Sequence, residues 1–587
     1  MATAAFRRLP GARAIVAIWL GCAAALIALA WPDIARLHAG DSDDYMRLLE
    51  VRDLLAGQHW FDLHQYRMNP PFGASMHWSR LVDLPIAAAL LVARGFLAEP
   101  FASAAAMTVV PLLELLVAML MMRRMLLALG ESEAVARIGA AILLLFPMLL
   151  SNFLPLRIDH HAWQAIAALA CLAASRRPGW RGAAATGLLA AIWLSISLEG
   201  ELLVVALAGL MALRYLLRRE NALAPFLLGC GAALLVLFLA TRGPALLLHP
   251  TCDTAGLPHI AAFAGCGALA LGLPRLRWQA HPIARGLALA IIGGIGMALI
   301  ALPLGPCAID PYHGMDGLIR AVWFANIPEG LPIPRQDPQT VAMLVWSLAL
   351  LLAGFAMVRR RAAHPERWTE PFLFALAAVL LSFAMLRGAV AAQLLAVPFS
   401  ALLLANLWPK ARAIAPAPLR IVATLAVLLL LTPTFASAAG KLAEGAAARS
   451  DAPARGTPPA TGGACDYGTL ARLPVAHLFA PLDPGPEILV RTAHSVVAGD
   501  YHRNFAKIHE VLAAFTGDPR GAEAIVRANH ARYLVFCASS GESRILAAQR
   551  PDSLAATLRA GRAPDWLTPQ PGFAGALRVY ALRPGQS

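Results

Sequence analysis

The sequence predicts a polytopic α-helical membrane protein that ends in a small α/β domain, and three observations point to this fold class. Of the 587 residues, 59% are hydrophobic and only 14% are charged, which is far more apolar than an average soluble domain. Apolar runs close to the roughly 20 residues that cross a bilayer recur from residue 13 to residue 437. The composition then shifts to Pro, Gly and Ala over residues 446–463, before a stretch of ordinary soluble sequence.

The membrane spans are expected to be helices, because backbone exposed to lipid must satisfy its own hydrogen bonds and the runs are too long for barrel strands. The net charge of +14 comes from basic clusters that separate the apolar runs. Such clusters indicate how membrane helices are oriented, because short cytoplasmic loops are rich in Lys and Arg. Placing every cluster in the cytoplasm gives about thirteen helices with a cytoplasmic N-terminus and an external C-terminal domain. The basic charge is thus topological, and no nucleic-acid partner is predicted.

The predicted domains are a transmembrane region over residues 1–440 with a large external loop at 33–83, a linker at 441–463, and an external domain at 464–587. The first apolar run is expected to remain as a helix, because Trp31-Pro32-Asp33 is a poor cleavage site. In the external domain, residues 487–490 and 533–536 are predicted to be strands. Residues 505–516 and 520–529 between them have helical periodicity.

The eight cysteines divide into two groups under this topology. Four fall in or at helices, where cysteine usually acts as a small apolar residue: Cys22, Cys171, Cys230 and Cys266. The other four fall outside, in a compartment that permits disulfides. Their positions allow the pairs Cys252–Cys307 and Cys465–Cys537, and the sequence leaves open whether these bonds form.

Several polar residues are expected to meet on the outer face. Asp41, with Asp43 and Asp44, follows the first span directly, where charges are costly unless they have partners or a function. Taken singly, each motif has an ordinary explanation: a solvated loop at 41–47, a helix cap at Asp159, or an arginine that reaches toward head groups at Arg387. The topology, however, places all of them on one side.

Carboxylate and imidazole groups suit Mg²⁺ or Mn²⁺, metals that neutralise a phosphate leaving group. We therefore predict a divalent metal site made by Asp41, Asp159, His161 and Glu329. Arg387 is predicted to bind the phosphate of a lipid-linked donor, since a guanidinium can grip phosphate with two hydrogen bonds. Glu199 and Glu201 are expected to form a polar turn, and the alternative is that they support the metal ligands from behind. Further candidates for substrate binding are Asp43, Arg47, Tyr66, His77, Trp78, Arg80, His160, Tyr501 and His502.

These motifs resemble the GT-C class of membrane glycosyltransferases, and most closely the catalytic subunit of bacterial and archaeal oligosaccharyltransferases. Asp41 with Tyr45 and Arg47 is similar to the first acidic motif of that subunit, and Asp159-His160-His161 is similar to the second. Glu329 takes the place of its loop glutamate, and Arg387-Gly388 resembles its phosphate-binding helix. The chain departs from the family at Pro481-Leu482-Asp483-Pro484-Gly485, where the acceptor-peptide motif carries two tryptophans.

The resemblance and the site together predict a metal-dependent glycosyltransferase in the bacterial cytoplasmic membrane. It would move a sugar or oligosaccharide from a polyprenyl phosphate or pyrophosphate to an acceptor on the periplasmic face. Asp41 or Asp44 would act as the general base toward the acceptor. Other readings stay open: a single-sugar transferase that modifies lipid A or a polysaccharide, a noncatalytic glycolipid transporter, or a glycolipid-binding scaffold. The sugar, acceptor, metal and oligomeric state are not determined by the sequence.

Overall fold

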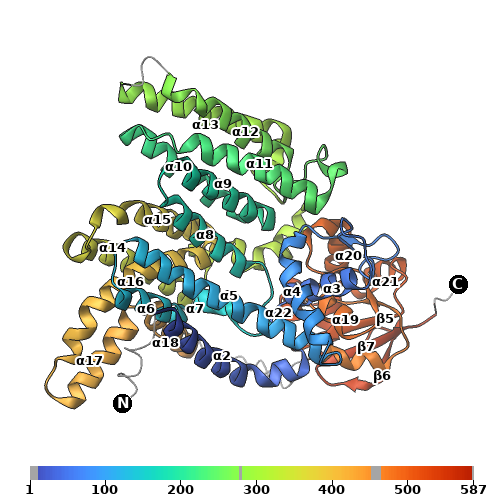
Figure 1. Cartoon of the computed structure of the whole chain (residues 1–587). Helices are drawn as coiled ribbons and strands as arrows, with labels where there is room; N and C mark the ends of the chain where they lie inside the picture. The colour runs from blue at the N-terminus through green and yellow to red at the C-terminus, as the bar shows by residue number, and fades with distance from the viewer. Residues whose placement is uncertain (1–10, 276–279, 451–464, 585–587) are drawn as a thin grey trace. The chain divides into compact units, whose positions relative to one another are not determined.

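A computed structural model describes residues 11–275, 280–450 and 465–584 of the chain (Figure 1). The chain divides into two compact units. We call the first the helical unit; it comprises Met1–His38, Ser79–Pro311 and Pro328–Ala452. The second, the mixed unit, comprises Ala39–Trp78, Tyr312–Ile327 and Pro453–Ser587.

The helical unit is built almost entirely of α-helices joined by short turns. The α-helices are α2 (Gly11–Arg36), α4 (Arg80–Arg94), α5 (Phe101–Ala128), α6 (Glu133–Ile142), α7 (Pro147–Leu150), α8 (His161–Ser175), α9 (Gly179–Ile196), α10 (Glu201–Arg218), α11 (Leu223–Arg242), α12 (Leu257–Leu271), α13 (Pro282–Leu304), α14 (Pro338–Arg361), α15 (Thr369–Ala384), α16 (Ala389–Arg412), α17 (Ala417–Leu430) and α18 (Pro433–Ser450). Three short 3₁₀ turns matter for the site: η3 (Leu198–Gly200), η9 (Pro328–Gly330) and η12 (Leu386–Gly388).

The prediction of a multi-pass helical membrane protein is confirmed. In the part of the chain that the structure describes, 9 helices are long and apolar enough to cross a membrane, or up to 11 if each bent helix pair is one span. Two more apolar helices lie outside that count, α8 with 15 residues and α9 with 18. The described residues thus supply 9 to 11 candidate spans toward the about thirteen helices expected from the sequence.

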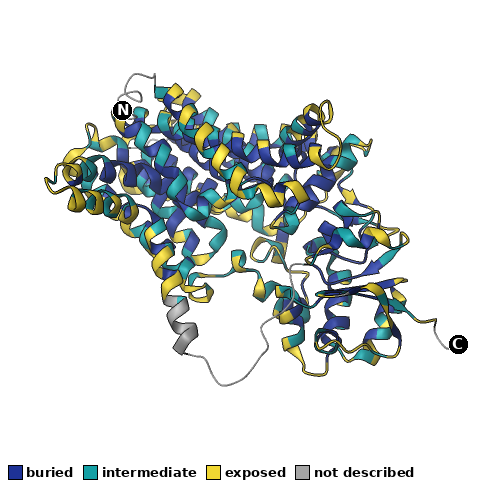
Figure 2. Ribbon diagram, turned by 90° about the horizontal axis from the view of Figure 1, so that it is seen from below, coloured by how far each residue is buried: buried dark blue, intermediate teal, exposed yellow. Residues whose placement is uncertain are grey.

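Helix α16 lies at the centre of the helical unit, where it packs against α6, α8, α14 and α15. Of its most apolar stretch, 89% is buried, whereas only 11% of the corresponding stretch of α13 is buried. Helices α8, α9, α11, α12 and α13 pack in that order as a row that ends at α13 (Figure 1). Figure 2 shows exposed residues in yellow along the helices. On α13 these include the large apolar residues Ile283, Leu287 and Ile291, as expected for a surface that faces lipid.

The mixed unit contains a five-stranded sheet in the order β4-β3-β5-β7-β6. Its strands are β3 (His477–Phe479), β4 (Ser495–Val496), β5 (Tyr533–Cys537), β6 (Leu567–Ala574) and β7 (Leu577–Leu582). The pairs β4/β3 and β3/β5 are parallel, and the pairs β5/β7 and β7/β6 are antiparallel. Its helices are α3 (Ser42–Leu55), α19 (Gly485–Arg491), α20 (Phe505–Thr516), α21 (Pro519–Ala528), α22 (Gly541–Gln549) and α23 (Leu554–Arg559).

The strand predicted at 533–536 and the helices predicted at 505–516 and 520–529 are present as β5, α20 and α21. The strand predicted at 487–490 is wrong, because these residues lie in helix α19. Pro486 stands in the first turn of this helix, where its fixed φ favours helix and its missing N–H costs nothing. The apolar run that suggested a strand instead packs against α3.

The segment predicted as a large loop at 33–83 is mostly ordered structure. Helix α2 continues to Arg36, and α3 is followed by the hairpin β1 (His64–Gln65) and β2 (Ala74–Ser75). The Arg67 guanidinium donates hydrogen bonds to the carbonyls of Leu489, Thr492 and His494. Met68 also forms a parallel bridge with Val496. Residues 39–78 therefore form part of the mixed unit, although they precede most of the membrane helices in the sequence.

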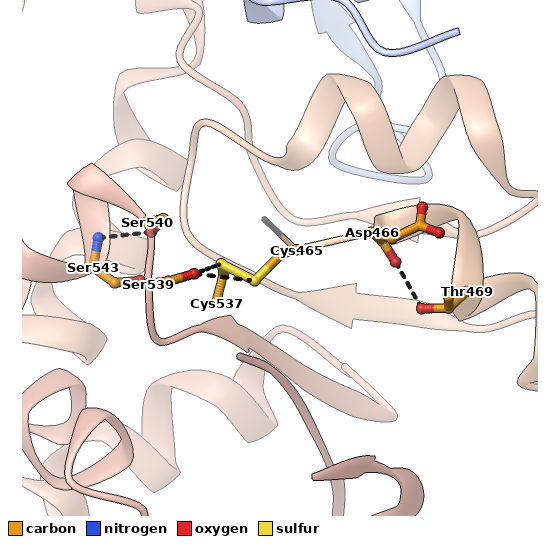
Figure 3. The surroundings of a disulfide bond; sticks show 7 residues. All are labelled: Cys465, Asp466, Thr469, Cys537, Ser539, Ser540 and Ser543. Carbon is orange, nitrogen blue, oxygen red and sulfur yellow. Dashed lines mark hydrogen bonds between the residues drawn. A yellow bond between two sulfur atoms is a disulfide. The ribbon is translucent and has the colours of Figure 1, made fainter. Parts of the chain in front are cut away.

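Both disulfides that the cysteine positions allow are present, Cys252–Cys307 in the helical unit and Cys465–Cys537 in the mixed unit. Figure 3 shows the second, with Cys537 at the end of β5 and the Ser539 hydroxyl 3.4 Å from the sulfur of Cys537. The four cysteines predicted in or at helices are free thiols. The predicted linker at 441–463 begins inside α18, and its residues from 451 onward lie outside the described residues.

Candidate active site

Asp159, His160 and His161 come together at the start of helix α8. All three side chains are buried, with exposed fractions of 4%, 5% and 9%. The Asp159 carboxylate accepts from the His160 backbone N–H at 2.6 Å and contacts the His160 ring. Its second oxygen lies 3.2 Å from His161 Nε2. One carboxylate thus holds two imidazoles side by side.

Glu329 and Arg387 reach the same place from two distant 3₁₀ turns, η9 and η12. Glu329 Oε2 lies 3.7 Å from His161 Nε2 and 3.7 Å from Arg387 Nε. The structure therefore gathers three of the four predicted metal ligands and the predicted phosphate-binding arginine in the helical unit. The fourth predicted ligand, Asp41, belongs to the mixed unit, and its place in a metal site remains a prediction.

Glu199 was expected first as part of a polar turn, with support of the metal ligands as the alternative, and it lies inside this cluster. Its Oε1 lies 2.6 Å from Arg387 Nη1, and its Oε2 accepts from Gln164 Nε2 at 2.7 Å. The same oxygen is 3.7 Å from His160 Nε2 and 3.8 Å from His161 Nδ1. A sequence signal for it existed, because Glu199 directly precedes a helix that enters the membrane from the same predicted side as Asp159.

Three helices begin at this cluster: α8 at His161, α10 next to Glu199, and α16 next to Arg387. A helix N-terminus carries partial positive charge and backbone N–H groups that lack helical partners, so it favours anions. A cavity of about 30 Å³ opens beside the cluster. Its polar lining is His161, Gln164, Trp193, Glu199 and Arg387, and the rest of its lining is mainly apolar.

Charge pairing keeps the acidic groups of the cluster ionised. Burial raises the pKa of Asp159, but the neighbouring His160 and His161 outweigh burial and hold this pKa well below its usual range. Burial likewise raises the pKa of Glu329, and the contacts with His161 and Arg387 outweigh it, so that this pKa is also lowered. Both carboxylates are therefore ready to bind a cation at neutral pH.

The chemistry of these donors fits a divalent metal. The ligand atoms of Asp159, His160 and His161 all lie within 4.8 Å of one another. A carboxylate with imidazoles suits Mn²⁺ or Zn²⁺ better than Mg²⁺, which prefers oxygen ligands alone. His160, predicted only as a substrate contact, stands equal to His161 as a candidate ligand.

The acidic segment at 41–44 forms the first turn of α3 in the mixed unit. Asp41 is the N-cap and accepts from the Asp43 backbone N–H at 3.0 Å. Asp41 and Asp43 are partly exposed, whereas Asp44 is 0% exposed. Of the two residues predicted as general base, only Asp41 is accessible, because Asp44 lies on the buried side of the helix.

Asp483 and Asp500 were not among the predicted site residues, yet both lie near Asp41 in the mixed unit. Burial and the Asp41 charge raise the pKa of Asp483 to about 6. Burial and the Asp483 charge raise the pKa of Asp500 to about 8, and the Ser42 hydroxyl donates to Asp500 at 2.6 Å. Asp500 comes from a sequence region far from Ser42, so no local pattern linked the two.

The remaining substrate candidates differ in accessibility. Tyr66 is 52% exposed and His77 is partly exposed, with its ring 4.6 Å from the ring of His502. Five candidates are buried: Arg47, Trp78, Arg80, Tyr501 and His502. Arg47 stacks on Trp78 at 4.3 Å, Tyr501 meets Trp78 edge-on, and Arg80 pairs with Asp83 at 3.1 Å. The contacts of Arg47, Trp78 and Tyr501 stabilise the mixed unit, and the Arg80–Asp83 pair lies in the helical unit.

Comparisons with known proteins connect this arrangement to one group of solved structures. No protein-family model and no curated protein matches the sequence. The archaeal oligosaccharyltransferase AglB of Archaeoglobus fulgidus, solved with an inhibitory peptide and a dolichol-phosphate, matches with a TM-score of 0.64 at 14% identity, over 97% of this chain and 74% of that one. The same enzyme solved with Zn and sulfate matches with a TM-score of 0.55 at 15% identity, over 93% and 69%. The chain therefore has the GT-C oligosaccharyltransferase fold.

Proposed function

We propose that this protein is a metal-dependent glycosyltransferase that uses a polyprenyl phosphate-linked sugar or oligosaccharide as donor. The observation that carries the proposal is the meeting of Asp159, His160, His161, Glu329 and Arg387 at the N-terminal ends of membrane helices. Phosphate-linked donors need such a combination of metal ligands, an arginine and helix N-termini. The fold it shares with AglB, which was solved with a dolichol-phosphate, supports the same class of donor.

Each group has a role in this proposal. Asp159, His161 and Glu329, with His160 available, would hold a divalent metal, and the two imidazoles favour Mn²⁺ over Mg²⁺. Bound there, the metal balances charge on the leaving phosphate. Arg387 binds a phosphate oxygen of the donor while the lipid tail stays in the bilayer. For Asp41, the accessible carboxylate of the first acidic motif, the resemblance to the oligosaccharyltransferase subunit implies the roles of a further metal ligand and of the group that orients the acceptor nucleophile.

The acceptor is less defined than the donor. The loop at Pro481–Gly485 lacks the two tryptophans of the acceptor-peptide motif, and its Asp483 lies among other carboxylates. We propose that the transfer takes place on the periplasmic face of a bacterial cytoplasmic membrane. The two disulfides support this side, because such bonds persist in oxidising compartments.

The test is the release of polyprenyl phosphate from a membrane lipid extract by the purified protein with Mn²⁺. We expect Asp159→Asn and Asp41→Asn each to lower release at least 100-fold, because each removes a charged ligand and leaves the others poorly held. The control is Asp565→Asn, which removes an exposed carboxylate from the mixed unit. Undiminished release in Asp159→Asn, or equal release in the presence of a chelator, would remove the metal site from the proposal. Glycolipid that binds but is never cleaved, with any acceptor supplied, would favour a transporter or scaffold.

A further inference from the structure

Glu199 is the one acidic residue of the cluster to which the proposed mechanism assigns no task, although it makes the shortest contact to Arg387. We propose that Glu199 is a positioning residue that holds the Arg387 guanidinium beside the metal ligands. In this position Arg387 and the metal can contact the same phosphate group. This inference rests on the proposed function for its purpose, but the contact it concerns can be tested without any donor.

The two carboxylate oxygens of Glu199 contact different parts of the site. Oε1 meets Arg387 Nη1 at 2.6 Å, a distance typical of a charge-assisted contact. Oε2 faces the opposite way, toward Gln164 at 2.7 Å and the two histidines at 3.7 and 3.8 Å. The carboxylate therefore bridges the arginine on η12 and the histidines at the start of α8.

Neighbouring side chains also fix the position of Glu199. Gln164 is turned toward Glu199 by Trp193, whose indole N–H donates to Gln164 Oε1 at 3.3 Å. Trp193 is 1% exposed, and a side chain at Gly200 would collide with its indole. The Ser197 hydroxyl also accepts from the Glu199 backbone N–H at 3.3 Å. A carboxylate so constrained can fix the direction of a flexible arginine.

An alternative role for Glu199 is to compete with phosphate for Arg387 and so weaken donor binding. An arginine side chain loses rotamer entropy when it is ordered, and Glu199 orders Arg387 before any phosphate binds. Glu329 Oε2 lies farther away, at 3.7 Å from Arg387 Nε, so the Nη1 contact with Glu199 is the stronger restraint. A guanidinium held at Nη1 directs its other N–H groups along a set direction, which favours a bidentate phosphate contact.

The experiment compares Glu199→Gln with Glu201→Gln in the full-length protein, after equal melting temperatures have shown that both variants fold. Glu201 is a matched control, because it lies two residues along the chain and meets His259 at 3.6 Å rather than Arg387. The first measurement is the binding of dolichyl phosphate in lipid nanodiscs. We expect Glu199→Gln to weaken binding about tenfold and Glu201→Gln to leave it unchanged. Equal or tighter binding in Glu199→Gln overturns the proposal.

The second measurement needs no lipid donor. Phenylglyoxal modifies arginines, and mass spectrometry reports the rate at Arg387 alone. We expect that rate to rise several-fold in Glu199→Gln and to stay at the wild-type value in Glu201→Gln. An unchanged rate overturns the positioning role. If wild-type protein binds no dolichyl phosphate but Arg387 reactivity still depends on Glu199, the proposed donor is wrong and the positioning role stands.

A graded series separates positioning from general loss of structure. Glu199→Asp keeps the charge but shortens the side chain, and Gln164→Leu removes only one support of the carboxylate. We expect both to bind dolichyl phosphate more strongly than Glu199→Ala, and Glu199→Asp to recover part of the turnover by restoring the charge. Identical defects in all three variants would indicate a structural role and would contradict the proposal.

Discussion

His477 illustrates how a single buried residue makes stability depend on pH. Its ring lies on β3, with Nδ1 2.9 Å from the Ser495 hydroxyl. Burial, together with the nearby Lys507 and His530, lowers the pKa of His477 to about 4. In the unfolded chain this pKa is near 6.5. The neutral ring therefore stabilises the mixed unit above pH 6.5, and this stability is lost as the pH falls toward 4.

We expect the advantage of the wild type over His477→Gln to shrink by about 1–2 kcal/mol between pH 7.5 and pH 4.5, after allowance for partial exposure of the ring. The measurement is the hydrogen exchange of β3 and β5 amides in both proteins at the two pH values. Other acid-sensitive groups act equally in both proteins, so the difference isolates His477. An advantage that stays constant, or that grows in acid, would contradict the assigned pKa.

At the scale of one element, the disulfide Cys465–Cys537 ties the first described residue of the C-terminal segment to the end of β5. The bond closes a sequence separation of 72 residues around α19, α20 and α21. A loop of this size limits the freedom of the unfolded chain, so the bond stabilises the folded state. Ser539, which contacts the bonded sulfurs in Figure 3, belongs to the turn before α22.

We expect the double variant Cys465→Ser/Cys537→Ser to lower the free energy of unfolding of the mixed unit by about 2–4 kcal/mol. Cys22→Ser is the control, since Cys22 is a free thiol in α2. Exchange rates at β5 report the change, and β5 amides should exchange faster in the double variant and under reducing conditions. If reduction leaves the wild-type rates unaltered, the bond does not contribute to stability.

Helix boundaries show where local sequence sufficed and where it did not. The strand at Tyr533–Cys537 and the helices α20 and α21 follow from periodicity and from Asp518, which caps α21. The run at 487–490 was too short for periodicity to separate a strand from a helix, and packing against α3 decided the outcome. Its partner lies more than 400 residues earlier in the chain, outside the reach of any local pattern.

For the whole molecule, the topology predicted from basic residues can be checked through the same cysteines. Cys465 and Cys537 are predicted to lie on the periplasmic side, whereas Cys171 and Cys230 are buried within helices. After mild reduction of intact spheroplasts, a membrane-impermeant maleimide should label Cys465 and Cys537, and it should not label Cys171 or Cys230. Labelling of the first pair only after lysis would invert the predicted orientation.

The candidate site was predictable in part, for a physical reason. Asp159, Glu329 and Arg387 could be assigned to one side because the positive-inside rule acts on each loop independently of how the helices pack. The same rule places Glu199 on that side, but it does not pair Glu199 with Arg387. Its contacts with Arg387 and Gln164 depend on how the turns η3 and η12 meet helix α8, which hydropathy does not encode.

The sequence by itself determined the membrane class, the helical content and the pairing options of the cysteines, and it predicted that Asp159, Glu329 and Arg387 gather at one place. These properties follow from composition and spacing, since the cost of burying charge in lipid applies residue by residue. Only the tertiary structure decided that residues 39–78 belong with the C-terminal domain, that Asp44 is buried while Asp41 is accessible, and that Glu199 joins Arg387 to the histidines. Those outcomes depend on contacts between segments hundreds of residues apart, and such contacts are set by the packing of the folded chain.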